Sequence, residues 1–177
     1  LLTRSQVNDG DRVLVTGASG GVGLATVQLA RQKGARVTAI AAAAKADAVL
    51  TAGAQSVLDR DASLPKEDFT VVIDVVGGNQ FGECLDALCP GGRLATSGAI
   101  AGPMAEVDLR TLYLKDLTVF GCTYQSREVF RALVSLINSG SLQPLVSKVY
   151  PLKDIAQAQT DFMAKRYPGK LVLRPFF

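Results

Sequence analysis

The chain has 177 residues, of which 48% are hydrophobic and 20% are charged, and its formal net charge is +3. This composition is typical of a soluble globular domain and excludes the intrinsically disordered class. Lys and Arg are scattered and aromatic residues make up only 6%, so the sequence lacks the basic stripe and stacking surface of nucleic-acid-binding proteins.

The longest uncharged run, residues 13–30, is interrupted by glycine and polar residues. We therefore expect a buried strand and a half-buried helix in this run rather than a membrane span. The N-terminus carries no signal peptide, and the chain starts at Leu1 without Met. We expect a cytoplasmic fragment of a longer protein.

Three cysteines, Cys84, Cys89 and Cys122, have no paired spacing, which indicates free thiols in a reducing compartment. Each is expected to act as a small, buried apolar side chain. Because the chain has no histidine and no Cys-x-x-Cys pair, we expect no zinc or other metal site within it.

The first third of the chain alternates strands and helices. Residues 13–16 form a short apolar strand, a glycine turn follows, and a helix runs to about Gly34, a residue that favours a helix C-terminus. A second strand is expected at 35–40, a short helix at 45–51 and a third strand at 55–58.

The middle of the chain continues this alternation. A run rich in β-branched residues at 70–76 is typical of a central parallel strand that is covered on both faces. A helix at 79–88 is expected to stop at Pro90-Gly-Gly. Further elements are a strand at 93–96, a helical turn at 109–114 and a strand at 117–122. Six strands that alternate with helices predict an α/β fold, a Rossmann-type doubly wound six-stranded parallel sheet in three αβα layers.

The last part of the chain departs from this rhythm. Ser126 caps a helix that ends at Gly140, and its apolar residues share one face: Val129, Leu133, Leu136 and Ile137. A strand at 146–150, a helix at 153–163 and a strand at 170–173 then form a strand–helix–strand return. We divide the chain into a Rossmann domain, residues 1–141, and a C-terminal return segment, residues 142–177.

The glycine turn after the first strand reads Gly17-x-x-Gly20-x-x-Gly23. Between a strand and a helix, such a turn lets the backbone approach a pyrophosphate, and the amides of the helix N-terminus favour anions. The strict G-x-G-x-x-G fingerprint is absent, because its first glycine would fall at Ala18. A structural glycine turn without a ligand stays open as an alternative.

Two other enzyme classes share parts of this turn. The segment Gly17-Ala-Ser19-Gly-Gly21 matches the G-x-S-x-G nucleophile elbow of hydrolases, but the chain has no histidine to act as the base. The segment from Thr16 to Gly23 matches the cofactor turn of short-chain dehydrogenases, but no tyrosine of the chain is followed four residues later by lysine. Neither chemistry is expected here.

The end of the second strand indicates which dinucleotide binds. In NAD-binding units an acidic residue at this place bonds the ribose 2′-hydroxyl, whereas this chain has only alanines from Ala41 to Ala44. The first charged side chain is Lys45, and Arg60 follows the third strand. Two cations beside an uncharged strand end favour NADP(H) over NAD(H), with Lys45 and Arg60 near the 2′-phosphate.

Four sequence blocks occur in the order found in one enzyme family. They begin at Val13 (VLVTGASGGVG), Val72 (VIDVVGG), Cys89 (CPGGRLATSG) and Val146 (VSKVYPLKDI), and the last is followed by GKLVL at Gly169. On these blocks the chain resembles the cofactor-binding half of a medium-chain dehydrogenase/reductase. The resemblance is to the zeta-crystallin-like quinone oxidoreductase branch of this zinc-type alcohol dehydrogenase-like superfamily.

The resemblance implies a set of cofactor contacts. It places the pyrophosphate on Ser19, Gly20, Gly21 and Val22, the adenosine ribose near Val75, Val76 and Gly77, and the nicotinamide end near Ser97, Gly98 and Ala99. It implies NADPH-dependent hydride transfer to a quinone or an α,β-unsaturated carbonyl substrate. It identifies no proton donor in this chain.

The resemblance also implies protein partners. A mostly β catalytic domain would precede Leu1, and residues 142–177 would pack on it. The strand at 117–122 would pair with its copy in a homodimer. Two alternatives of other kinds remain, an enoyl-reductase domain excised from a polyketide synthase and a non-catalytic, crystallin-like nucleotide-binding module.

Overall fold

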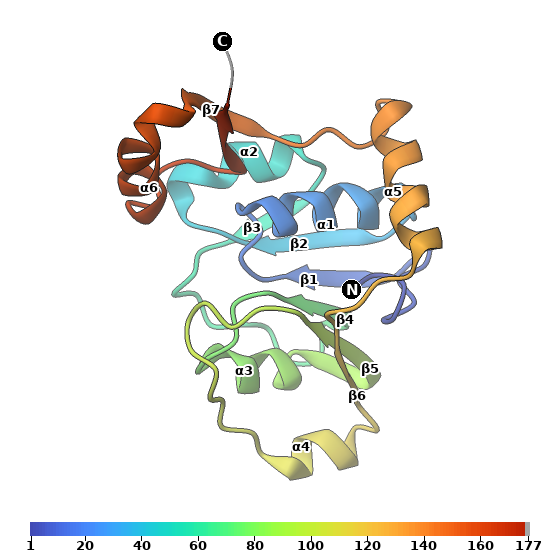
Figure 1. Cartoon of the computed structure of the whole chain (residues 1–177). Helices are drawn as coiled ribbons and strands as arrows, with labels where there is room; N and C mark the ends of the chain where they lie inside the picture. Colours follow the sequence, from blue (N-terminus) through green and yellow to red (C-terminus); the bar gives the residue numbers. More distant parts are fainter. Residues whose placement is uncertain (176–177) are drawn as a thin grey trace.

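The computed structural model describes residues 1–175. Within them, a six-stranded parallel sheet has the strand order β3-β2-β1-β4-β5-β6. Its strands are β1 (Arg12–Val15), β2 (Arg36–Ile40), β3 (Ser56–Leu58), β4 (Phe69–Asp74), β5 (Leu88–Thr96) and β6 (Thr118–Gly121). The helices between them are α1 (Gly21–Gln32), α2 (Ala46–Thr51), α3 (Gln80–Asp86) and α4 (Leu109–Leu114). Figure 1 shows α1 and α2 on one side of the sheet and α3 and α4 on the other. The predicted doubly wound Rossmann-type sheet is confirmed.

Both faces of the sheet are buried because the side chains of the central strands alternate between two apolar layers. In β1, Val13 and Val15 pack in the layer that contains α1, whereas Leu14 packs in the layer that contains α3. In β4, Ile73 joins the first layer and Val72 the second. This arrangement explains the nearly continuous apolar runs in the central strands.

The predicted boundary between the third helix and the fifth strand is wrong. The helix α3 ends at Asp86 and β5 begins at Leu88, where the sequence predicted helix up to 88 and strand only from 93. Leu88 is fully buried and pairs with Phe69 of β4, and the register of the ladder then shifts before Val71. The Pro90-Gly-Gly sequence therefore forms an irregularity within a strand rather than a break between two elements.

The C-terminal part forms a separate strand–helix–strand unit, as predicted. It follows α5 (Arg127–Asn138) and consists of β7 (Val146–Pro151), α6 (Ile155–Met163) and β8 (Lys170–Arg174), with β7 and β8 paired in parallel. Figure 1 shows this unit, coloured orange to red, beside α1 and α2 and outside the six-stranded sheet. Ser126 caps α5 as predicted, because its hydroxyl accepts a hydrogen bond from the Val129 amide.

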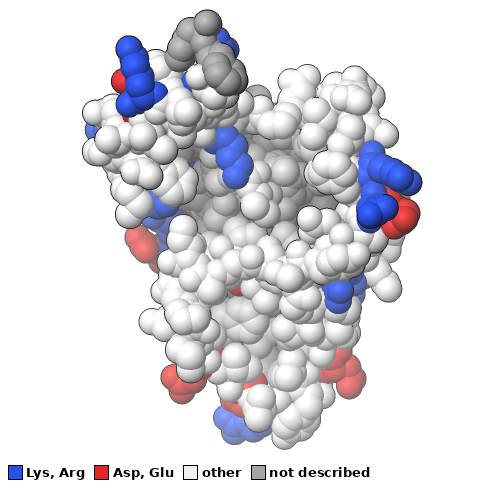
Figure 2. Space-filling view, viewed as in Figure 1, with Lys and Arg blue, Asp and Glu red and all other residues white. Residues whose placement is uncertain are grey.

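The apolar face predicted for α5 is not buried in this chain. No residue of α5 is fully buried, Val129 and Ile137 are exposed, and Leu133 and Leu136 are half-buried. Figure 2 shows few charged side chains over the middle of the face seen in Figure 1. The α5 helix is therefore amphipathic, but the described residues do not cover its apolar side.

Hydrogen bonds tie the return segment to the start of the Rossmann domain. The Gln28 side chain both donates to the Gln143 carbonyl and accepts from the Gln143 amide, each at 3.0 Å. The Gly169 amide donates to the Ser19 carbonyl at 2.8 Å, and Gly169 forms a parallel bridge with Gly20. The residue that precedes β8 thus lies directly on the glycine turn.

Two further expectations concern the surroundings of the chain. The strand β6 lies at one edge of the six-stranded sheet, and its pairing with a second copy stays a prediction. Within residues 1–175, no helix is both long and apolar enough to cross a membrane.

Candidate functional site

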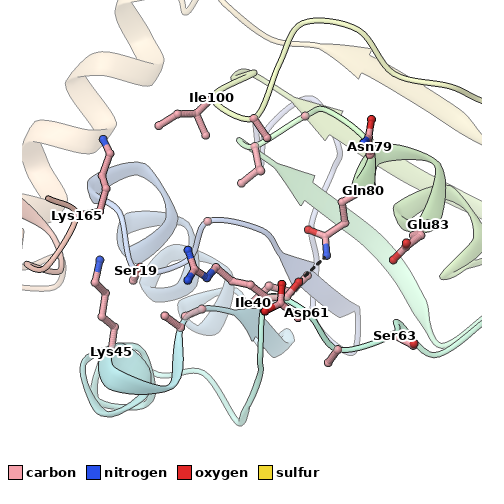
Figure 3. A pocket seen from close by; sticks show the side chains of 18 of the residues that line it. Ser19, Ile40, Lys45, Asp61, Ser63, Asn79, Gln80, Glu83, Ile100 and Lys165 are labelled. Carbon is pink, nitrogen blue, oxygen red and sulfur yellow. Dashed lines mark hydrogen bonds between the residues drawn. The ribbon is translucent and has the colours of Figure 1, made fainter. Parts of the chain in front are cut away.

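A cleft of about 960 Å³ opens at the carboxyl ends of β1, β2 and β4, where Gly17, Ile40 and Val76 line it (Figure 3). The strand order reverses between β1 and β4, because β2 and β3 lie on one side of this pair and β5 and β6 on the other. Ligands of doubly wound sheets bind at such a switch point. The position of the cleft therefore follows from the connectivity of the chain.

The glycine turn forms one wall of this cleft and requires glycine for steric reasons. Gly17 has a φ of +57°, and a Cβ at this residue would lie 3.0 Å from the side chains of Val75 and Val76. A Cβ on Gly23 would overlap the Gly17 carbonyl oxygen and the Ala18 backbone, which cannot move aside. Glycine at both positions lets the turn stay closed and the backbone stay open to a ligand.

The turn presents a helix N-terminus to the cleft. The helix α1 begins at Gly21, its N-cap is Gly20, and no side chain caps its first amides. No acidic residue lies in its first turn. The free amides and the helix dipole together favour a bound anion such as a pyrophosphate.

Three cations line the cleft on the side of β2 and β3. Lys45 comes from the turn after β2, Arg60 from the loop after β3, and Lys165 from the end of α6. Figure 3 shows the Lys45 and Lys165 side chains lying near each other. Burial, Arg60 and Lys165 all lower the pKa of Lys45. Mutual repulsion of this kind is relieved when an anion binds between the cations.

The sequence predicted two of these cations and missed the third. Lys165 lies in the return segment with a φ of +53°, and its ammonium lies 4.0 Å from the centre of the Phe162 ring. No local pattern marks this lysine, because it reaches the cleft only through the packing of α6 beside the glycine turn. The hydrogen bond from Gly169 to Ser19 is the contact that brings this segment there.

Part of the predicted cofactor site lines the cleft directly. The predicted lining residues are Ser19, Lys45, Arg60, Val76 and Gly77. The structure brings these residues together from four connecting segments of the sheet. Their contacts with a cofactor stay predictions.

The other residues predicted at the pyrophosphate lie around the turn rather than in the wall of the cleft. Gly20 caps α1, and Val22 is 49% exposed on the outside of its first turn. The Lys170 side chain occupies the space where a Cβ on Gly21 would be, so Gly21 packs closely on the return segment. The first turn of α1 is therefore shared between the cleft and the return segment.

The residues predicted at the nicotinamide end lie beside the cleft at the end of β5. The Ser97 amide donates to the Asp74 carbonyl at 3.1 Å. A Cβ on Gly98 would lie 2.6 Å from the Val75 carbonyl oxygen, so this loop packs closely on the segment after β4. Ala99 lies next to Gly77, and its neighbours Ile100 and Ala101 line the cleft.

Several polar lining residues were not predicted. Asn79, Gln80 and Glu83 come from the start of α3, and Asp61 and Ser63 come from the loop after β3. Figure 3 shows the Gln80 amide near this loop, where it donates to the Arg60 carbonyl at 3.5 Å. Their signal in the sequence is only their place directly after predicted strands, which many surface residues share.

The cysteines and acidic residues do not form a metal site in this part of the chain. Among residues 1–175, no three side chains of His, Cys, Asp or Glu gather as a ligand set. Burial, Asp74 and Glu83 raise the pKa of the Cys84 thiol to about 12, so this cysteine stays protonated.

Comparison with known proteins identifies the family. Residues 21–139 match the model of the family described as zinc-binding dehydrogenase. An acryloyl-coenzyme A reductase of Metallosphaera sedula is 33% identical over 97% of the chain, and a quinone oxidoreductase of Sus scrofa is 31% identical over 98%. The chain spans about half the length of these curated relatives, 53% and 57% respectively.

A solved structure gives the same result. A protein of Sinorhizobium meliloti, provisionally named an alcohol dehydrogenase, superposes with a TM-score of 0.93 at 47% identity. The superposition covers 99% of this chain and 51% of the other. The fold, the glycine turn at the switch point and the family match agree. The chain belongs to the zinc-binding dehydrogenase family of the medium-chain dehydrogenase/reductases and covers its C-terminal, cofactor-binding half.

Proposed function

We propose that this chain is the NADP(H)-binding part of a reductase that transfers hydride to an α,β-unsaturated carbonyl compound or a quinone. The observation that carries the proposal is the cluster of Lys45, Arg60 and Lys165 beside a strand end without a carboxylate. A 2′-phosphate would satisfy these cations, whereas a free ribose 2′-hydroxyl would leave them unpaired.

Different residues of the chain would bind different parts of the cofactor. The amides at the start of α1 would face the pyrophosphate, and the three cations would hold the 2′-phosphate. Val76 and Ile100 give the cleft apolar walls on the side of β4 and β5. When bound, the cofactor supplies the hydride from its reduced nicotinamide ring, and the protein contributes orientation and exclusion of water.

The choice of substrate class rests on the relatives. One is named an acryloyl-coenzyme A reductase and another a quinone oxidoreductase, and both names describe reduction of an electron-poor double bond or ring. Because these relatives are about twice as long, we expect the chain alone to bind NADPH but to turn over substrate slowly.

The cofactor assignment is tested by the affinity of the chain for NADPH and NADH. Lys45→Ala should weaken NADPH binding on the order of tenfold, as expected for a lost charge-assisted hydrogen bond, and leave NADH binding unchanged. Isothermal calorimetry measures both affinities. Arg36→Ala is the matched control, because it removes the same charge from the exposed, opposite end of β2.

Two outcomes would contradict the proposal. If the Lys45→Ala variant loses affinity for NADPH and for NADH by the same factor, this lysine does not recognise the 2′-phosphate. No binding of either nucleotide by the unaltered chain would leave the glycine turn as a structural feature.

A further inference from the structure

One buried carboxylate lies just before the lining residues Val76 and Gly77 and is not among the predicted site residues. Asp74 ends β4 and is only 2% exposed. Its Oδ1 accepts hydrogen bonds from the Thr16 hydroxyl at 2.7 Å and the Val76 amide at 3.1 Å. Its Oδ2 accepts from the Gly77 amide and the Thr96 hydroxyl, both at 3.1 Å.

These donors come from the ends of three adjacent strands. Thr16 directly follows β1 and precedes the glycine turn, and its hydroxyl also accepts from the Val75 amide at 3.1 Å. Val76 and Gly77 belong to the segment after β4, and Thr96 is the last residue of β5. Asp74 therefore links the glycine turn to both segments that lie across the switch point.

Direct contacts make the two segments across the switch point one block. The Ala101 amide donates to the Val76 carbonyl at 2.9 Å, and the Gly78 amide donates to the Gly102 carbonyl at 3.1 Å. Gly98 fits against Val75 only because it lacks a Cβ. The glycine turn is joined to this block through the hydroxyl of Thr16 and the carboxylate of Asp74.

Burial of such a carboxylate is costly unless hydrogen bonds compensate for it. Asp74 forms no ion pair within residues 1–175, so its compensation comes from amides and hydroxyls that converge from different strands. The hydrogen bond from the Thr16 hydroxyl, at 2.7 Å, has the length of a charge-assisted bond, and the other three are 3.1 Å long. Together they connect the ends of the three strands through one carboxylate.

We infer that Asp74 is a positioning residue that sets how the second half of the dinucleotide lies relative to its phosphates. This inference rests on the proposed function. A dinucleotide crosses the switch point, with its adenosine half on the side of β2 and β3, where the cations gather, and its nicotinamide half at the end of β5, where Ser97, Gly98 and Ala99 lie. The hydrogen bond from the Thr96 hydroxyl to Asp74 should then affect the binding of the nicotinamide half and not the binding of the adenosine half.

The test compares two ligands of the full chain. NADPH occupies both halves of the cleft, whereas 2′,5′-ADP occupies only the adenosine half. Thr96→Val removes one hydroxyl from Asp74 and keeps the side-chain shape. It should weaken NADPH on the order of tenfold and change the affinity for 2′,5′-ADP by less than about twofold. Thr96→Ser keeps the hydroxyl, and this variant should bind both ligands with the affinities of the unaltered chain.

Asp74→Asn replaces one acceptor oxygen by an amide donor. Like Thr96→Val, it should weaken the binding of NADPH more than the binding of 2′,5′-ADP. Thr70→Val is the matched control. Thr70 lies at the opposite end of β4, where its hydroxyl donates to the Asp11 carboxylate at 2.7 Å. Its loss should lower the stability of the chain but leave the ratio of the two affinities unchanged. The fluorescence of bound NADPH reports the nicotinamide end independently and should change only in the Thr96→Val and Asp74→Asn variants.

The outcomes separate the inference from the proposed function. If Thr96→Val leaves the ratio unchanged, or weakens both ligands alike, Asp74 stabilises the fold and does not position the ligand. If Asp74→Asn does not fold, the Thr96 pair decides alone. If the unaltered chain binds neither ligand, the proposed function falls, and the inference falls with it.

Discussion

The molecule contains two parallel strand–helix–strand arrangements that are held together in opposite ways. In the six-stranded sheet, Val13, Leu14 and Ile73 are completely buried between two layers of helices. In the return segment, Val146 and Val149 of β7 stay exposed. The comparison teaches that similar backbone geometry can rest on apolar burial in one place and on polar bonds in another.

The polar bonds of the return segment centre on one carboxylate. Asp161 is nearly buried on α6, and it accepts hydrogen bonds from the Tyr150 hydroxyl, the Lys148 ammonium and the Gln157 amide. Arg166 adds an ion pair at 3.5 Å. This network fixes α6 on β7, and through α6 it holds Lys165 at the cleft.

The largest change in stability is expected for a substitution in the core of the six-stranded sheet. Ile73→Ala should lower the free energy of unfolding by about 3 kcal/mol, because the site is fully buried and leaves a cavity. Val149→Ala on β7 should change it by less than about 1 kcal/mol, because that side chain is 45% exposed. Urea unfolding of the chain measures both. If both substitutions lower the free energy of unfolding by similar amounts, the two regions do not differ in how they are stabilised.

The second prediction tests the Asp161 network through pH. Hydrogen bonds from Tyr150 and Lys148 lower the pKa of Asp161 to about 2, whereas the carboxyl of an unfolded chain titrates near 4. The charged form therefore stabilises the return segment above about pH 4, and this contribution disappears as the pH falls towards 2.

Asp161→Asn is the variant that reveals this contribution. Amide hydrogen exchange of α6 should be faster in Asp161→Asn than in the unaltered chain at pH 6, and the difference should shrink between pH 4 and pH 2. Comparison at equal pH removes the intrinsic pH dependence of exchange. A difference that is independent of pH would show that the charge of Asp161 is not what holds α6.

The smallest expected effect concerns the junction of the two regions. Gln28→Ala removes both hydrogen bonds to the Gln143 backbone and should cost less than about 1 kcal/mol of overall stability. It should nevertheless speed limited proteolysis of the loop around Gln143, because that loop is no longer hydrogen-bonded to α1. Gln125→Ala, on an exposed loop, is the control and should leave the cleavage rate unchanged. Faster cleavage in both variants would contradict a specific role for Gln28.

The same contrast explains what the sequence could predict. The strands of the sheet were located because buried strands carry apolar runs, and the ligand site was located because a glycine turn between a strand and a helix favours a bound pyrophosphate. Lys45 and Arg60 were found because they are the first cations after the second and third strands. All of these signals are local in the sequence or follow from the strand order.

The missed features depend on contacts between distant segments. Lys165 reaches the cleft only through the packing of the return segment. Asp74 was read as an interior residue of an apolar strand at 70–76, and its role depends on hydroxyls from β1 and β5. The start of β5 was missed because Leu88 belongs to a strand only through its pairing with Phe69.

The hydrogen bond between Gly169 and Ser19 has a consequence for the order in which the protein is made. Chains fold from the N-terminus as they leave the ribosome, so the glycine turn emerges long before its partner. The sheet around the turn is complete once β6 has emerged, but Lys165 and Gly169 emerge only with the return segment. A nascent chain that stops after β6 would carry the glycine turn without its hydrogen bond to Gly169, so this turn is completed only after the return segment has been made.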